Sequence, residues 1–267
     1  MDLASIGGTV LAIVILVVVM ILDGGSPAEL FHHSAPIILT LGGSAVVSFI
    51  TGPIDVVFRI PKLLKIFVIN NKFDEFETID LITSMADKAR REGLLALEEE
   101  SKKVEDEFLR KGIMLVVDGI EPAQVQAILE LEITQMKERH EEGINFFVQA
   151  GGFSPTMGII GTVMGLISVL KQLSDPDKLA ASIASAFLAT LWGLLSANLI
   201  WLPIGGKLSA RNYEEVAYRK MLVEGILSLQ AGENPRLIRE KLLTFLPPAI
   251  REKASTKSAT PTTEANS

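Results

Sequence analysis

Two threonines within the most apolar part of the sequence carry the side chains best suited to chemistry. At helical spacing, Thr162 lies on the same side as Gly158 and Gly165, and Thr190 is flanked by small residues that include Gly193. A hydroxyl on such a face can line a path for an ion. The same pattern is typical of close helix packing, with each hydroxyl bonded back to its own helix. The sequence leaves both interpretations of each threonine open.

The two threonines lie on the two halves of a predicted membrane hairpin. Residues 143–170 and 179–206 contain no charged side chain, and each run exceeds the roughly 20 apolar residues that a helix needs to cross a bilayer. The polar segment KQLSDPDK between them suits a short turn. We therefore expect a membrane unit at residues 146–206, with antiparallel spanning helices over about 150–170 and 179–204.

A second pair of spans is predicted within residues 1–58. The run LASIGGTVLAIVILVVVMIL lacks the basic start and the small-residue cleavage pattern of a secretory signal, so we expect a retained span over about 3–22. Another span is expected over about 34–58, where Asp55 is the only charge and lies close to the basic end. The predicted fold class is all-α: a polytopic membrane protein with four transmembrane helices and a helical cytoplasmic domain.

The remaining segments are predicted to be cytoplasmic. Residues 59–145 combine many acids and bases with apolar residues at helical spacing, so we expect a small helical domain there, with breaks at Gly93, Gly112 and Gly119. Residues 207–252 have helix-compatible patterns, and residues 253–267 are expected to form a disordered tail. Basic residues follow the second and fourth spans, so the positive-inside rule places both termini in the cytoplasm.

Composition excludes several classes of function. A mean hydropathy of +0.37 over 267 residues is too apolar for an ordinary soluble domain. A net charge of -7 argues against a nucleic-acid partner, which needs clustered Lys and Arg. The chain has no cysteine and three histidines, which argues against a metal site, and no cofactor is expected. No nucleophile stands beside a base, so we expect no catalytic residues and no enzyme.

The predicted spans also lack a carboxylate, lysine or histidine near the bilayer centre. Proton relays and most cation paths in membranes use ionisable side chains, and a self-contained transporter would need substrate groups at its midplane. If this chain conducts ions, either another subunit supplies the acid or hydroxyls and carbonyls suffice, as in a filter. The pattern favours one wall of a shared pathway.

Four segments of the sequence are the most specific: PTMGIIGTVMGL, AFLATLWGLLSAN, LPIGGKL and ARREGLLALE. They closely resemble the MotA family of flagellar motor stator subunits, within the MotA/TolQ/ExbB superfamily, and the resemblance extends to about Phe245. It implies an inner-membrane protein that forms a homopentamer around two copies of a MotB-like single-span partner, whose aspartate binds the ion. TolQ-like or ExbB-like energisers of outer-membrane processes are the alternative within the superfamily, but they have three spans.

The resemblance also assigns roles to particular residues. It implies that Thr162 and Thr190 line the ion path and that Pro155 and Pro203 couple the pore to cytoplasmic shape, since proline removes a backbone donor and can kink a helix. Sodium-driven relatives often carry a threonine where this chain has Ala189, which favours protons, although the Thr162 position is alanine in several proton-driven relatives.

A charged pair in the cytoplasmic segment matches the family's rotor contact. The resemblance implies that Arg90 and Glu98 bind the rotor protein FliG. On a continuous helix Arg91 would align better with Glu98, seven residues away, unless Gly93 breaks the helix. Without the resemblance, the ordinary interpretation of this charge run is a solvated helix face.

Overall fold

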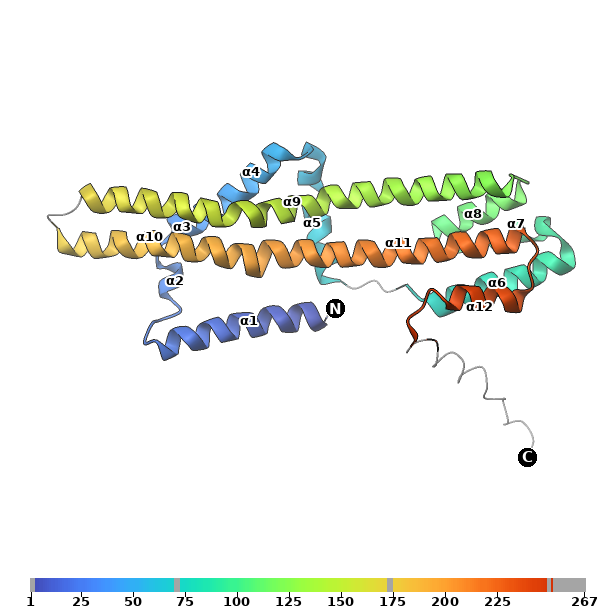
Figure 1. Cartoon of the computed structure of the whole chain (residues 1–267), viewed down its shortest axis with the longest axis horizontal. Coiled ribbons are helices and arrows are strands. Elements are labelled where there is room, and N and C mark those ends of the chain that lie inside the picture. The colour runs from blue at the N-terminus through green and yellow to red at the C-terminus, as the bar shows by residue number, and fades with distance from the viewer. Residues whose placement is uncertain (1–2, 70–72, 172–174, 249–250, 252–267) are drawn as a thin grey trace, which may run out of the picture. The chain divides into compact units, whose positions relative to one another are not determined.

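The computed structural model describes residues 3–69, 73–171, 175–248 and 251; the predicted tail at 253–267 lies outside them. The elements follow one another as helices (Figure 1). They are α1 Leu3–Leu22, α2 Glu29–His32, α3 Ser34–Ile37, the π-helix η1 Ile38–Gly42, α4 Gly43–Thr51, α5 Ile54–Val68, α6 Glu75–Glu92, the 3-10 turn η2 Leu94–Ala96, α7 Leu97–Ser101, α8 Glu107–Val117, α9 Pro122–Lys171, α10 Pro176–Ser196, the π-helix η3 Ala197–Trp201, α11 Leu202–Gln230 and α12 Pro235–Leu243.

The chain divides into two compact units. The first contains residues 1–71 and 138–212, and the second contains residues 72–137 and 213–267. Helices α9 and α11 contribute residues to both units, so the segments predicted as separate spans and cytoplasmic helices are continuous in the chain. Expected helical content is confirmed, since the described residues contain no strand.

Three helical stretches in the described residues are long and apolar enough to cross a membrane: Ser34–Thr51, Pro122–Lys171 and Lys178–Gln230. Helix α1 is also apolar, with Gly7–Leu22 forming a shorter stretch of the same character. Large apolar side chains on these helices remain exposed, such as Leu11 at 60% and Leu170 at 67%. A lipid environment accounts for such exposure, because water would disfavour it.

The helix expected over residues 34–58 ends earlier, at Thr51. Gly52 and Pro53 are extended, with ψ values of 168° and 141°, and α5 begins anew at Ile54. Proline disfavours helical backbone in the residue before it and supplies no N–H donor, which explains the break. Asp55 therefore lies in the first turn of α5, where the helix dipole favours an acid, and not within the apolar helix.

The second unit has its own apolar core. Side chains from α6, α8 and α12 pack there with side chains from α9 and α11, among them Ile79, Ile113, Leu129, Leu222 and Ile238. Each of these five is at most 1% exposed. Burial on this scale holds the short helices in place and leaves their opposite faces free for other contacts.

Two of the three glycines expected to break helices in this unit do so, and one does not. Gly93 and Gly119 do end helices, with φ values of +87° and +74° that favour glycine. Gly112, expected to be a break, lies inside α8. A Cβ there would lie 2.3 Å from Cδ1 of Ile226, so the glycine permits close packing. The sequence pattern could not distinguish a terminating glycine from a packed one.

Candidate functional site

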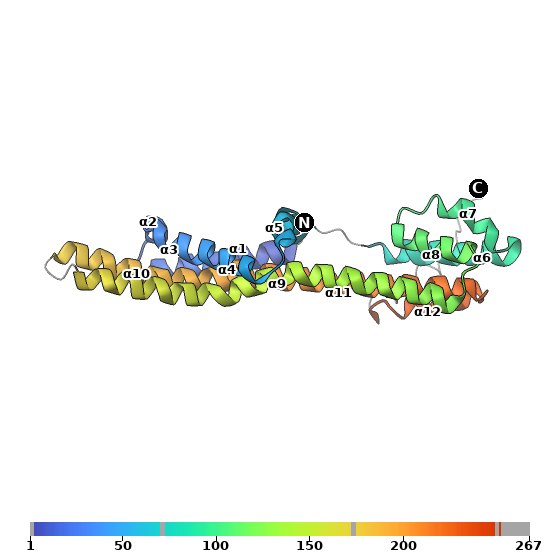
Figure 2. The ribbon, with the colours of Figure 1, turned by 90° about the horizontal axis from the view of Figure 1, so that it is seen from above.

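The small-residue faces of α9 and α10 meet directly within the first unit. The two helices lie side by side in both views (Figure 2). A Cβ added to Gly158 would lie 2.8 Å from the Ala189 carbonyl oxygen, and one added to Gly193 would lie 2.9 Å from the Ser154 carbonyl oxygen. Their backbones therefore approach too closely for any side chain at these positions. This is the packing that small residues allow between helices in lipid.

Thr162 and Thr190 face each other across this contact. Their hydroxyls are hydrogen-bonded, and Thr162 Oγ1 also lies 3.0 Å from the carbonyl oxygens of Gly158 and Ala186. Carbonyls accept and cannot donate, so the single Thr162 proton goes to one of them and Thr190 donates to Thr162. In the part of the chain that the structure describes, no donor reaches the Thr190 oxygen, whose lone pairs remain available. Both side chains are half-buried.

The geometry combines the two interpretations that the sequence left open. Thr162 is bonded to its own helix and to the neighbouring one, so it serves packing. The Thr190 hydroxyl donates its proton to Thr162, but its oxygen can still accept a hydrogen bond. Thr190 is therefore better placed than Thr162 to bind a proton donor or a cation.

A second pair of hydroxyls was not anticipated from the sequence. Ser154 and Ser196 are hydrogen-bonded to each other and are both 0% exposed. Ser154 lies two turns along α9 from Thr162, and Ser196 lies on the same face of its helix as Gly193. The signal was present, because both serines extend the small-residue spacing. A second buried hydroxyl pair tightens the same helix contact.

A third row of hydroxyls runs along η1 and α4. Thr40, Ser44 and Ser48 are at most 1% exposed, and each donates to the carbonyl four residues earlier, at 2.8, 2.6 and 2.9 Å. The row has the four-residue spacing that marked the other helices, yet sequence reasoning missed it. All three protons are used within the helix, so these hydroxyls serve packing in this structure.

Ala189, the residue before Thr190 in the sequence, also lies in the packed contact. Ala189 is 2% exposed, and its Cβ would lie 2.6 Å from a Cβ at Gly161. A side chain at residue 161 would therefore collide with Ala189 unless the helices moved apart. Ala189 therefore also belongs to the close packing between α9 and α10.

The two prolines lie within long helices. Pro155 is inside α9, directly after Ser154, and Pro203 is the second residue of α11, directly after the π-helix η3. Proline leaves the carbonyl four residues earlier without its usual donor, and a π turn is one way for a helix to absorb that defect. Both prolines are half-buried. Each helix therefore has a weakened point close to the hydroxyl pairs.

Within the described residues 34–51, 146–170 and 179–204 there is no Asp, Glu, Lys, Arg or His. No group of three or more potential ligands in the described residues is arranged to hold a metal ion. The hydroxyl-lined contact can accept hydrogen bonds, but it cannot itself titrate. An ion carried as a proton would need an acid from elsewhere.

The charged pair lies in the second unit, at the turn between α6 and α7. Arg90 and Arg91 lie in the last turn of α6, which ends at Glu92; Gly93 caps it, and Glu98 lies in the first turn of α7. Basic residues at a helix C-terminus and acidic residues at an N-terminus are both favoured by the helix dipole. The two predicted residues therefore lie on different helices, and the alignment argument for a continuous helix does not apply.

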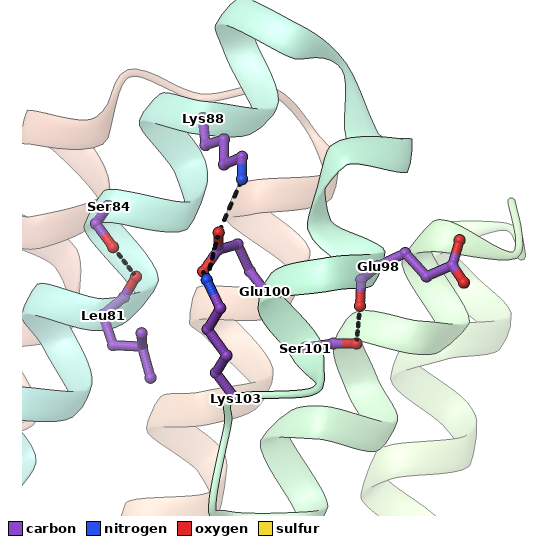
Figure 3. A network of polar contacts seen from close by, with 7 residues as sticks. All are labelled: Leu81, Ser84, Lys88, Glu98, Glu100, Ser101 and Lys103. Carbon is purple, nitrogen blue, oxygen red and sulfur yellow. Dashed lines mark hydrogen bonds and ion pairs between the residues drawn. The ribbon is translucent and has the colours of Figure 1, made fainter.

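Most charges at this turn are paired with each other (Figure 3). Glu100 accepts from Lys88 at 2.8 Å and from Lys103 at 3.2 Å, which ties α7 to α6. The hydrogen bond from Lys88, followed by that from Lys103, lowers the pKa of Glu100 below its ordinary value, and the same Glu100 bond raises the pKa of Lys88. These charges hold the turn together.

Arg90, Glu92 and Glu98 are the exceptions among the described residues. Arg91 is paired with Asp87 at 2.7 Å, whereas in the described residues neither Arg90 nor Glu98 has a side-chain ion pair. Both are exposed, and Figure 3 shows the Glu98 carboxylate directed away from Lys88 and Glu100. The turn thus has one base, Arg90, and two acids, Glu92 and Glu98, free to meet a partner, and this favours Arg90 over Arg91 for such a contact.

Comparison with known proteins is consistent with this geometry. Residues 100–221 match the sequence profile of the MotA/TolQ/ExbB proton channel family. Motility protein A of Bacillus subtilis (strain 168) is 38% identical over 255 residues, which cover 95% of this chain and 94% of that protein. A chain in the structure of C. jejuni MotAB has a TM-score of 0.88 at 33% identity and covers 93% of this chain and 97% of that one. A chain in the flagellar MotAB stator complex from Bacillus subtilis has a TM-score of 0.87 at 35% identity and covers 97% and 100%.

Proposed function

The chain belongs to the MotA/TolQ/ExbB proton channel family, and we propose that it is the stator subunit of a bacterial flagellar motor. With a MotB-like partner it forms an ion channel that couples ion flow to torque on the rotor for motility. It is a multi-pass membrane protein of a family of ion-channel stator subunits, not of enzymes. The names of its relatives give no support to an energiser of outer-membrane processes.

The observation that carries the proposal is the hydroxyl-lined contact without an acid. Thr190 keeps a free acceptor beside α9, yet no described residue within 34–51, 146–170 and 179–204 can carry a proton. A single-span partner that brings one aspartate to this face would complete the path. The protonated aspartic acid would donate a hydrogen bond to the Thr190 oxygen, and the charged form would lose that bond. Loading and release of the ion would thus change the contact between the two subunits.

For the assembly, we adopt the arrangement that the family resemblance implies. Five copies around two partner helices would turn their α9 and α10 faces inward, while the apolar side chains of α1 would meet lipid. Four helices, including α1, would span the inner membrane, with both termini in the cytoplasm, as the basic residues after the second and fourth spans favour. Pro155 and Pro203 would let α9 and α11 bend when the partner's acid changes charge.

The rotor contact is assigned to Arg90 and Glu98, with the rotor protein FliG as the partner. Their lack of ion pairs among the described residues supports this assignment, since unpaired exposed charges lose little by binding. Protons are the proposed driving ion.

Ion flux in vesicles tests the proposal directly. Vesicles that contain this chain alone should pass neither protons nor sodium, whereas vesicles that also contain the MotB-like partner should pass protons. A partner whose aspartate is changed to asparagine is the matched control and should abolish the flux. Robust cation flux from the chain alone would contradict the shared pathway, and flux that follows sodium would contradict the proton assignment.

A further inference from the structure

Leu95 is the most exposed leucine of the second unit that the structure describes. Its side chain is 74% exposed, whereas Leu94 is partly buried against the core and Leu97 is 0% exposed. The 3-10 turn explains the difference, because residues three apart share one face of such a turn. Leu94 and Leu97 therefore point into the unit and hold Leu95 on the opposite side.

The backbone around Leu95 is closely held. The Gly93 amide donates to the Ala89 carbonyl oxygen at 2.9 Å and so closes α6, and the Ala96 amide donates to the Gly93 carbonyl oxygen at 3.2 Å. Gly93 takes a φ of +87°, which other residues rarely adopt. Because the turn is already ordered, Leu95 would lose little conformational freedom on meeting a partner.

A single exposed leucine is ordinary on any surface. Leu95 differs because it lies in the sequence between Arg90 and Glu98, and in the described residues Arg90, Glu92 and Glu98 of this turn have no ion pair. An apolar side chain bordered by one free base and two free acids has the composition of a small interface, with an apolar centre and a polar rim. The surface is continuous with the contact assigned above to the rotor.

We propose that Leu95 is the apolar anchor of the rotor contact. It inserts into an apolar depression of the rotor protein, with an acidic side chain of that protein facing Arg90 and a basic one facing Glu98. The charges set orientation and the rate of association, and the leucine supplies most of the affinity, because exposed ion pairs contribute little. This inference rests on the proposed function, in which the turn between α6 and α7 meets the rotor.

The test uses the full stator complex with its partner subunit, in lipid nanodiscs, and purified FliG as the probe. Leu95→Asn should weaken FliG binding by roughly 10- to 100-fold, the equivalent of leaving one leucine unburied. Leu95→Met should bind within a few-fold of the original, because it keeps an apolar side chain. Leu237→Asn is the matched control, since Leu237 is 50% exposed on α12 of the same unit, and it should leave binding unchanged.

The salt dependence of FliG binding distinguishes the contribution of Leu95 from that of the charged residues. The loss caused by Leu95→Asn should persist at about 0.5 M salt, whereas the effect of Arg90→Glu should shrink as screening increases. Ion flux and the amount of complex in the membrane should not change with Leu95→Asn.

Normal FliG binding by Leu95→Asn would overturn the inference, and so would disassembly of the stator, which would place Leu95 between copies of this chain. If Arg90→Glu weakens binding and Leu95→Asn does not, the proposed role of Leu95 is wrong but the assignment of the rotor contact stands. If neither variant weakens binding, the assignment of the rotor contact fails with it.

Discussion

The hydroxyls of Thr162 and Thr190 are hydrogen-bonded to each other across the contact between α9 and α10, although 28 residues separate them in the sequence. Thr162 donates to a carbonyl and accepts from Thr190, so the two residues are not equivalent. Thr162 fixes the contact, and Thr190 keeps the free acceptor. This asymmetry gives different expectations for variants of the two residues.

Thr190→Ala should reduce ion-dependent swimming and ion flux more than Thr162→Ala does, because it removes the acceptor proposed to face the partner's aspartate. Thr162→Ala should instead lower the thermal stability of the complex, by an amount comparable to one hydrogen bond within a membrane, about 0.6 kcal/mol. Serine at either position is the control, since it keeps the hydroxyl. If both alanine variants swim like the wild type across a range of proton gradients, the two threonines serve helix packing and not the ion path.

Gly158→Ala should push α9 and α10 apart and lower the melting temperature of the complex, because the new Cβ would lie 2.8 Å from a backbone oxygen that cannot turn away. Overpacking of this kind costs about 1–3 kcal/mol. Gly152→Ala is the matched control on the same helix, since no atom lies within 4 Å of its Cβ position. It should leave stability unchanged or raise it slightly. Equal melting temperatures for the two variants would contradict the close approach.

Pro155→Ala and Pro203→Ala should leave the stator in the membrane but reduce torque. Alanine restores the missing backbone donor and stiffens the helix at the point where we propose that it bends. Torque on a tethered cell and the amount of stator in membrane fractions are the two measurements. Loss of the protein from the membrane would show that the prolines serve folding and not coupling.

Arg90→Glu should slow or stop swimming while the stator remains in the membrane, and a matching charge reversal on FliG should restore it. Like charges facing each other at an interface oppose association. Arg91→Glu is the control and should impair swimming less, because Arg91 is already paired with Asp87 at 2.7 Å. The opposite ranking of the two variants would identify Arg91 as the contact.

The link between α6 and α7 should be independent of pH near neutrality. The hydrogen bond from Lys88 lowers the pKa of Glu100, so the stabilising contribution of Glu100 is present above its unfolded pKa of about 4.3 and is lost as pH falls through the lower folded value. The raised pKa of Lys88 keeps its contribution present below about 10.4, and that contribution is lost only as pH rises through the higher folded value.

Glu100→Gln should therefore speed hydrogen exchange in residues 97–101 at pH 7. Glu99→Gln should not, because its partner Lys102 belongs to the same turn and ties α7 only to itself. A marked change in exchange of the unaltered turn between about pH 6 and pH 8 would show that some other titrating group controls it.

The sequence by itself determined the all-α class, the apolar stretches and the small-residue faces. These features follow from residue type and helical period, which are local properties that can be read directly from one amino-acid sequence. Gly158, Thr162 and Thr190 could be selected for the same reason. The positive φ of Gly93 was also within reach, since a glycine between two helical patterns commonly ends a helix.

Tertiary structure decided which of these features meet. The pairing of Ser154 with Ser196 and the direction of the Thr190 proton depend on how two helices are set against each other, and that distance in space has no counterpart in sequence spacing. Gly112 shows why sequence alone was insufficient. A glycine can end a helix, or it can lie inside a helix and let another side chain, here Ile226, pack closely against it. Arg90 and Arg91 differ by a local feature instead, because Asp87 lies four residues before Arg91 on α6 and pairs with it.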